Sequence, residues 1–463
     1  MTLWTYLTET VCGTVSAAVL LVAGVWFACS LRGFAYLRPL ATVRALLKRS
    51  RGADGSPFRA LCVALAGTLG VGNIAGVALA IATGGAGSLF WMWVCALLVS
   101  FLKYAEITLA MRYKQAEPHL PTHGAVRYIA DLPGRLGRWG GGVFAASTVL
   151  VSLTLGGTVQ GGAIAAVAEE TLSVSPLAVG LVLLALTAWV VMGGAGRVIS
   201  LASRWIPLLS VLYVGMCLWV VCLNLHGLPA VLAEVMRDAF SADSVGGGVL
   251  GFVSVRALRV GCTRGLFSNE AGCGTAPSAH ATAEVDLPAR QGLLGIVEVL
   301  VDTVVFCTLT GLVLLLSLDR VEETGGGMEA VRRAFSLWFG RVGEWALLFF
   351  VFAFAFATVA CWSFYGREAL DYFRPKKTGR TVYQTAFCLS VSVGCLLVSP
   401  VAWQVTDVLL CLMTVLNVTA LCRHRRAVVE ETGRLGLMPT PADGSGAPRR
   451  RVRPPCLSRR EDP

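Results

Sequence analysis

Long apolar runs follow one another along almost the entire chain, and this pattern most constrains the fold. Only 14% of the 463 residues are charged, whereas soluble proteins carry about 25%. A bilayer-spanning helix needs about 20 apolar residues, and the sequence holds eleven such runs. They exclude a soluble enzyme, a disordered scaffold and a fibrous protein, and they predict an all-α polytopic membrane protein. The predicted spans are residues 10–31, 58–83, 87–111, 141–170, 175–193, 203–224, 247–280, 290–318, 341–372, 380–399 and 402–423.

The distribution of basic residues predicts how these spans are oriented. Lys and Arg gather in connections that alternate with connections lacking them. The basic connections are 32–57, 112–140 and 374–380, and those without basic residues are 84–86, 171–175 and 399–401. Basic loops remain in the cytoplasm, so we expect the N-terminus outside and the C-terminus inside. The net charge of +11 then needs no nucleic-acid partner.

Two of the predicted spans are unsuited to a continuous helix. The second contains GTLGVGNIAG at 67–76, and each interior glycine costs about 1 kcal/mol of helix propensity relative to alanine. The seventh contains RGLFSNEAGCGTAPSAH at 264–280, with a Ser-Asn-Glu triplet among glycines. Irregular backbone at membrane depth is tolerated where it lines a cavity or is buried in protein. Glycine packing grooves are the alternative, but they do not explain the polar triplet.

Two broken helices five spans apart predict a five-plus-five inverted-repeat fold with a binding site between the repeats. Residues 1–57 would then form an accessory helix and a basic loop, 58–224 the first repeat and 225–423 the second. Residues 424–463 read as a disordered basic cytoplasmic tail that fixes topology, with attraction to anionic lipid headgroups as the other interpretation. A monomer is compatible with this organisation.

Several polar residues are predicted to lie inside the membrane, where they are functional candidates. Lys103 and Glu106 are three residues apart and can pair with each other on one helix face. Gln160 stands between glycines and is a candidate site residue. Glu298 and Asp302 share a face and are expected near an arginine of the seventh span. The three candidate arginines are Arg256, Arg259 and Arg264.

The chain resembles the bacterial alanine/glycine:cation symporter family over residues 58–423. The motifs that carry the resemblance are GTLGVGNIAGVALAIATGGAGSLFWMW, KYAE, RGLFSNEAGCGTAPSAHA, EVLVDTVVFCTLTGL and FAFATVACWSFYGRE. The resemblance implies a secondary transporter of the bacterial inner membrane that imports small neutral amino acids, such as alanine or glycine, with Na⁺ by alternating access. Its partners would be the amino-acid substrate and the lipid bilayer.

The resemblance also implies which residues form the site. Exposed amides at the break of the second span would receive the substrate carboxylate, and carbonyls at the break of the seventh would receive its ammonium. Phe267 and Trp362 would restrict the substrate side chain to hydrogen or methyl. The implied substrate-binding residues are Gly70, Val71, Gly72, Asn73, Gln160, Phe267, Ser268, Asn269 and Trp362. The implied Na⁺ ligands are the Thr358 hydroxyl and the carbonyls of Ala66 and Leu69.

Two departures from the family pattern bear on the coupling ion. The family usually has threonine at position 71 and serine or threonine at position 357, where this chain has Val71 and Ala357. A proton-coupled symporter or an exchanger on the same fold is therefore the alternative function. An intramembrane enzyme is disfavoured because no HExxH or GxSxG motif occurs, and no GxxxxGK[ST] motif indicates ATP-driven transport.

Overall fold

The computed structural model describes residues 12–47, 56–240, 256–317, 327–397 and 400–438, and every regular element within these ranges is a helix. Seven helical segments are long and apolar enough to cross a membrane, which confirms a polytopic membrane protein. They are α2 (Gly13–Ser30), α7 (Gly87–Ala116), α9 to α10 (Gly134–Leu172), α12 (Gly194–Leu223), α17 to α18 (Pro288–Leu315), α20 (Arg341–Asp371) and most of α22 (Pro400–Arg423).

The remaining predicted spans are formed by shorter helices. α11 (Pro176–Met192) and α21 (Lys377–Leu396) correspond to two single predicted spans. The second predicted span consists of α5 (Ser56–Thr68), the short η2 (Val71–Asn73) and α6 (Ala75–Gly84). The seventh consists of α15 (Arg256–Asn269) and α16 (Ala276–His280), and its residues 247–255 lie outside the described residues. The total of eleven spans and the inverted repeat remain predictions.

The structure interrupts both helices at the glycine-rich segments. Gly70 has an extended backbone between α5 and η2. Between α15 and α16, Gly272 and Gly274 adopt φ values of 85° and 79°, a region that side chains disfavour. Glu270 also has a positive φ, 51°, although it carries a side chain. A non-glycine residue held there costs about 1–3 kcal/mol, and such residues cluster at functional sites.

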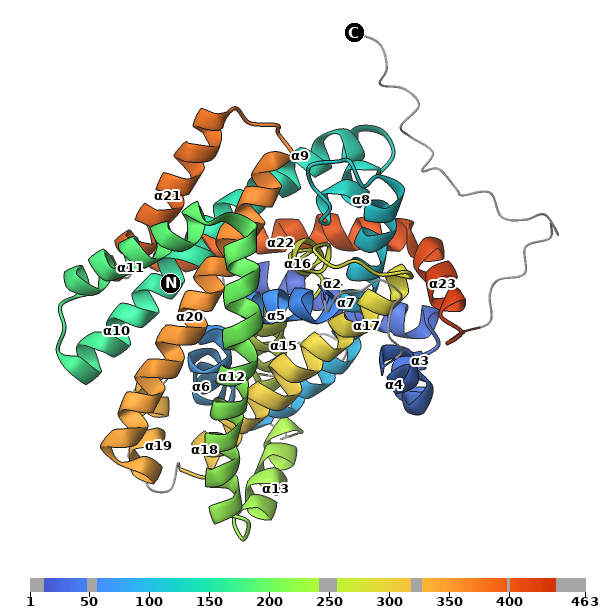
Figure 1. The fold of residues 1–463 in the computed structure, drawn as a ribbon. Coiled ribbons are helices and arrows are strands. Elements are labelled where there is room, and N and C mark those ends of the chain that lie inside the picture. The colour runs from blue at the N-terminus through green and yellow to red at the C-terminus, as the bar shows by residue number, and fades with distance from the viewer. Residues whose placement is uncertain (1–11, 48–55, 241–255, 318–326, 398–399, 439–463) are drawn as a thin grey trace.

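The helices form two groups that meet at the breaks. α7 packs along both α15 and α17, so that three segments distant in sequence form one group. α11 packs along α21, and both contact α10, which also packs on α20. Figure 1 shows α20 and α12 running side by side past α5 and α6. The breaks therefore lie where the group around α7, which includes α15, meets the group around α20.

Two transmembrane segments contain π-helical turns that the sequence analysis did not predict. η3 (Ser152–Val159) joins α9 (Gly134–Val151) to α10 (Gln160–Leu172). η5 (Leu300–Cys307) joins α17 (Pro288–Val299) to α18 (Thr308–Leu315). π-Helical turns inside α-helices are frequent at functional sites. η5 lies beside both breaks, since it contacts η2 and α15, while η3 contacts α20.

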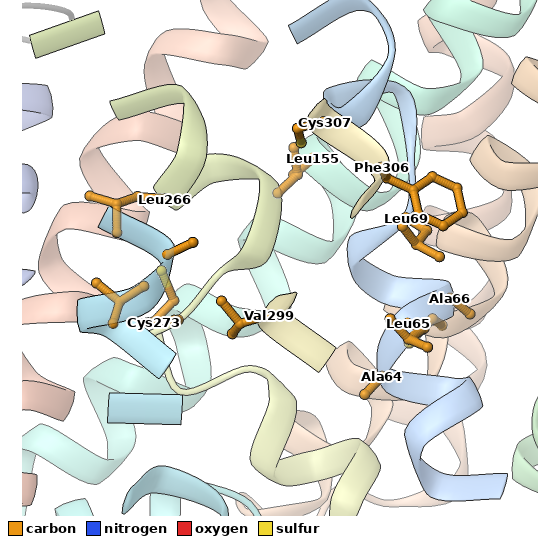
Figure 2. Close-up of a cluster of buried hydrophobic side chains, with 14 of the residues drawn as sticks. Ala64, Leu65, Ala66, Leu69, Leu155, Leu266, Cys273, Val299, Phe306 and Cys307 are labelled. Carbon is orange, nitrogen blue, oxygen red and sulfur yellow. The ribbon is translucent and has the colours of Figure 1, made fainter. Parts of the chain in front are cut away.

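Apolar side chains fill the space around the interrupted segments. Figure 2 shows part of this buried core, to which α5, η3, α15 and η5 all contribute. The labelled members are Ala64, Leu65, Ala66, Leu69, Leu155, Leu266, Cys273, Val299, Phe306 and Cys307. Water does not reach the backbone groups freed inside such a core, so the protein itself must satisfy them.

Short helices lie at the two ends of the membrane-spanning part. α13 (Leu228–Ala239), α18 and α19 (Met328–Phe339) lie together at one end, at the bottom of Figure 1. α8 (Val126–Ala130) lies near the other end, and α3 (Phe34–Leu37) and α4 (Pro39–Leu47) follow α2. Apart from α18, which ends the predicted span 290–318, none of these helices is among the predicted spans.

The start of the expected disordered tail is instead an ordered helix, α23 (Arg425–Arg434). Arg112 donates to Glu430 at 2.9 Å, and the Tyr104 and Thr432 hydroxyls are 2.8 Å apart. These contacts hold α23 on α7, which the basic composition of the tail did not reveal. Residues 439–463 of the expected tail lie outside the described residues.

The packing of α17 on α7 depends on a glycine, and this generates a test. A Cβ at Gly292 would overlap the Thr108 hydroxyl and lie 2.9 Å from the Tyr104 carbonyl oxygen, whereas one at Gly215 would meet no atom within 4 Å. We expect Gly292→Ala to destabilise the protein by about 1–3 kcal/mol through overpacking. The matched Gly215→Ala should be neutral or stabilising. Thermal unfolding in detergent measures both, and equal midpoints would contradict the packing described here.

Candidate functional site

A cavity of about 150 Å³ lies between the two breaks. Its wall is built from η2 and α6 on one side, α15 on another, and η3, α10 and α20 on a third. It extends to Gly327, the residue before α19, and to Trp403, near the start of α22. Eight of the residues implied by the family resemblance line it, namely Gly70, Val71, Gly72, Gln160, Phe267, Ser268, Thr358 and Trp362.

The first break brings backbone close to polar side chains of other helices. The Thr358 hydroxyl donates to the Ala66 carbonyl at 2.9 Å and lies 3.1 Å from the Phe354 carbonyl. A Cβ at Gly70 would lie 2.9 Å from the Thr358 hydroxyl and 3.4 Å from Gln160 Oε1, so a glycine permits this approach. Leu69 precedes it and is buried. Thr358 and the end of α5 thus present hydroxyl and carbonyl oxygens to one small region.

Asp302 of η5 joins the two breaks. One carboxylate oxygen accepts from Asn73 at 2.8 Å, and the other accepts from Ser268 at 2.7 Å and from Thr303 at 2.9 Å. Asn73 also donates to Ser268 at 2.9 Å, and its side-chain oxygen accepts from the Gly70 amide at 3.3 Å. Asn73 therefore holds the first break, and Asp302 ties that break to the second.

Two site features escaped the sequence reasoning. Asp302 was grouped with Glu298 as a partner of an arginine, but its described side-chain partners are the neutral Asn73, Ser268 and Thr303. Its position inside an apolar span made it a functional candidate, but not a link between the two breaks. Arg264 and Glu270 also line the cavity, although the first was expected near Glu298 or Asp302.

The buried ion pair differs from the expected one. Lys103 pairs with Glu298 of α17 at 3.2 Å, rather than with Glu106 on its own helix. Glu298 in turn contacts His280 at 3.0 Å. The membrane-embedded part that the structure describes buries four carboxylates against one ammonium, one guanidinium and one imidazole; these groups are Glu106, Glu270, Glu298, Asp302, Lys103, Arg290 and His280.

Asn269 supports the site from behind rather than lining the cavity. Its side chain donates to Thr303 at 3.1 Å and accepts from the Ala271 amide at 3.0 Å. Its carbonyl accepts from Lys103 at 2.7 Å. The side-chain NH₂ group, the side-chain oxygen and the backbone carbonyl of Asn269 all bond to protein. These contacts fix the backbone at the second break.

Two residues of the cavity wall carry a buried polar atom without a hydrogen-bond partner among the described residues. Gln160 Oε1 and Trp362 Nε1 have no hydrogen-bond partner in the described part of the chain. A buried polar atom left without a partner is costly, so a bound molecule that supplies one is favoured. Gly156 lets Trp362 occupy this wall, because a Cβ at Gly156 would lie 2.7 Å from Trp362 Cγ.

The chain is similar to a known protein family over most of its length. The model of the sodium:alanine symporter family matches residues 2–434. The probable sodium/glutamine symporter GlnT of Bacillus subtilis is 34% identical over 414 residues, or 87% of this chain and 84% of the relative. The amino-acid carrier protein AlsT of the same organism is 34% identical over 368 residues, or 78% and 76%. The sodium/alanine symporter AgcS of Methanococcus maripaludis is 34% identical over 387 residues, or 82% and 84%. These are transporters, not enzymes.

The junction at Asp302 generates a test that requires no substrate. Asp302→Asn would direct an NH₂ group at hydrogen-bond donors, since both carboxylate oxygens accept from side chains. We expect a loss of about 1–3 kcal/mol of stability from the unsatisfied groups. Thr303→Ser is the matched control because it retains the hydroxyl beside Asp302. Thermal unfolding compares them, and a wild-type midpoint for Asp302→Asn would refute the junction.

Proposed function

The chain belongs to the sodium:alanine symporter family, and from this premise we propose that it imports a small neutral amino acid, alanine or glycine, together with Na⁺. The observation that carries the proposal is the cavity between the two interrupted helices, whose wall combines backbone at the breaks with the unpartnered Gln160 and Trp362 atoms. Discontinuous helices at the membrane midplane are the usual binding site of secondary transporters.

The proposed substrate lies with its carboxylate at the first break and its ammonium at the second. The start of α6 directs positive backbone dipoles toward Gly70 and Gly72, which suits a carboxylate. Carbonyls at the end of α15 and the carboxylate of Glu270 suit an ammonium. Phe267 and Trp362 leave room for a small side chain in a cavity of about 150 Å³.

The proposed Na⁺ position is at Thr358 and the end of α5. Thr358 Oγ1 and the Ala66 carbonyl oxygen are 2.9 Å apart. The Leu69 carbonyl would be the third Na⁺ ligand. Hard cations favour neutral and anionic oxygen ligands of this kind. The excess of buried carboxylates over buried cationic groups also favours the uptake of a cation with the zwitterionic substrate.

We place the two repeats at 58–224 and 225–423, with the N-terminus outside and alternating access between the helix groups. The packing of α7 on α17, the second helix of each repeat, supports this assignment. The packing of α11 on α21, which are the fourth spans of the two repeats, supports it as well. Under this orientation Gly327 and Trp403 lie on the outer side, so the cavity extends outward.

Proton coupling or exchange on the same fold is the second candidate. It is favoured by Ala357, which supplies no hydroxyl beside Thr358, and by the buried carboxylates near the cavity. Glutamine is the competing substrate, because GlnT and AgcS are both 34% identical to this chain.

Uptake into proteoliposomes tests the proposed function. Radiolabelled alanine, glycine and glutamine are offered under an inward Na⁺ gradient or an inward proton gradient. We expect alanine or glycine to accumulate under the Na⁺ gradient. Glutamine should compete only weakly, because Phe267 and Trp362 leave too little room for its larger side chain. Uptake driven by protons alone would establish the second candidate, and uptake of none of the three would refute both.

Thr358 allows a direct test of the cation position. Thr358→Val retains the shape and removes one proposed oxygen ligand, so the half-saturating Na⁺ concentration should rise by about tenfold, equivalent to about 1.4 kcal/mol. Thr358→Ser retains the oxygen and is the matched control. Uptake is measured at several Na⁺ concentrations with saturating alanine. An unchanged Na⁺ dependence in Thr358→Val would place the cation elsewhere.

A further inference from the structure

Two oppositely charged residues on α7 hold the two ends of the break between α15 and α16. The Lys103 ammonium donates to the carbonyl of Asn269, the last residue of α15, at 2.7 Å. The Glu106 carboxylate accepts from the Gly274 amide, shortly before α16, at 3.1 Å. We propose that Lys103 and Glu106 are positioning residues that set the geometry of the second break and, through it, of the proposed substrate site.

The spacing of the two residues fits this role. Positions three apart on a helix share one face, so Lys103 and Glu106 face the loop 270–275 together. The charges also match the backbone groups that they contact. A cation is favourable at a helix C-terminus, where carbonyls lack intrahelical partners, and Lys103 contacts the last carbonyl of the fourteen-residue α15. Glu106 accepts from a backbone N–H group that the break leaves outside any helix.

Lys103 is held in place by a charge partner on another helix. Its ammonium is fully buried and lies 3.2 Å from Glu298 Oε1. The other oxygen of Glu298 is 3.0 Å from His280 Nε2, and His280 Nδ1 is 2.8 Å from Gln291 Nε2. Buried ion pairs are seldom more stable than apolar side chains of the same size. Stability alone therefore does not account for a lysine here, whereas a contact with the Asn269 carbonyl does.

Glu106 is positioned from a third helix. Asn417 of α22 donates to Glu106 Oε1 at 2.6 Å and to the Gly272 carbonyl at 2.9 Å. The Asn417 side-chain oxygen accepts from the Tyr128 hydroxyl at 2.7 Å. The loop between α15 and α16 is therefore held by α7 at both ends and by α22 at its middle.

This arrangement refines the proposed substrate contacts, and it rests on the proposed function. The Asn269 carbonyl already accepts from Lys103, so the substrate ammonium is left with the carbonyls of Phe267 and Ser268 and the carboxylate of Glu270. Ser268 immediately precedes Asn269 and also donates to Asp302. Displacement of the Asn269 carbonyl would therefore move the wall of the cavity without removing any group that lines it.

The experiment replaces the charged pair by a neutral pair of similar size. Lys103→Met with Glu298→Gln removes the ammonium without leaving Glu298 unpaired in the core. The matched control is Lys114→Met with Glu284→Gln, because Lys114 also lies on α7, pairs with a glutamate at 2.6 Å and donates to the Ala283 carbonyl at 2.8 Å. That pair lies at the end of α7, with Glu284 exposed.

Two measurements compare the variants with the wild type. Hydrogen exchange of peptides covering 264–280 reports the break without any substrate, and equilibrium binding of alanine or glycine reports the site. For Lys103→Met/Glu298→Gln we expect the hydrogen-exchange rate of residues 264–280 to rise by about tenfold or more. The dissociation constant of the amino acid should rise by a similar factor, as loss of a charged hydrogen bond predicts. The control should remain at wild-type values.

Wild-type exchange and affinity in Lys103→Met/Glu298→Gln would overturn the proposal. If the double variant is not monodisperse, Glu106→Leu is tested instead, since it removes the one oxygen that accepts from both the Gly274 amide and Asn417. Faster exchange of the Gly274 amide would support the proposal, and unchanged exchange would overturn it. Failure of the wild type to bind either amino acid would refute the proposed function alone, because the exchange comparison needs no substrate.

Discussion

A helix interrupted in the middle of a membrane leaves backbone groups that can form hydrogen bonds neither with water nor within their own helix. In this protein, buried side chains of other helices supply the missing partners. Two such interruptions lie next to each other, at Gly70 and between Asn269 and Thr275. Asp302 accepts hydrogen bonds from a residue of each break. Lys103 and Glu106 satisfy the carbonyl and the amide that the second break exposes. Polar residues inside the bundle thus form one connected support for the irregular backbone.

The same support explains why the site lies where it does. Ser268 and Thr358, which face the cavity, are neutral and belong to elements fixed by buried hydrogen bonds, while Arg264 and Glu270 are the charged residues of its wall. The carboxylates outnumber the cationic groups in the membrane-embedded part that the structure describes. A site of this kind offers backbone ends to a zwitterion and retains a net attraction for a cation. Family membership and electrostatics therefore favour the same proposal, the joint transport of an amino acid and a cation.

The sequence predicted the two breaks because glycine and a Ser-Asn-Glu triplet contradict a continuous apolar helix. It also led to eight residues that line the cavity, through the family resemblance. It did not predict the partners of buried charges, because pairing depends on which helices become neighbours. Lys103 was expected to pair with Glu106 within its own helix, and it pairs with Glu298 instead. The π-helical turns and the docking of α23 likewise depend on tertiary contacts that hydropathy does not encode.

In the proposed function, the two breaks form one amino-acid site whose occupancy is linked to a cation. Equilibrium binding of alanine to the purified protein, in Na⁺ and in choline⁺ at equal ionic strength, tests it most directly. We expect Na⁺ to tighten alanine binding by about tenfold or more, and alanine to tighten Na⁺ binding by the same factor, because linkage is reciprocal. Equal alanine affinity in the two salts would contradict the coupling to Na⁺.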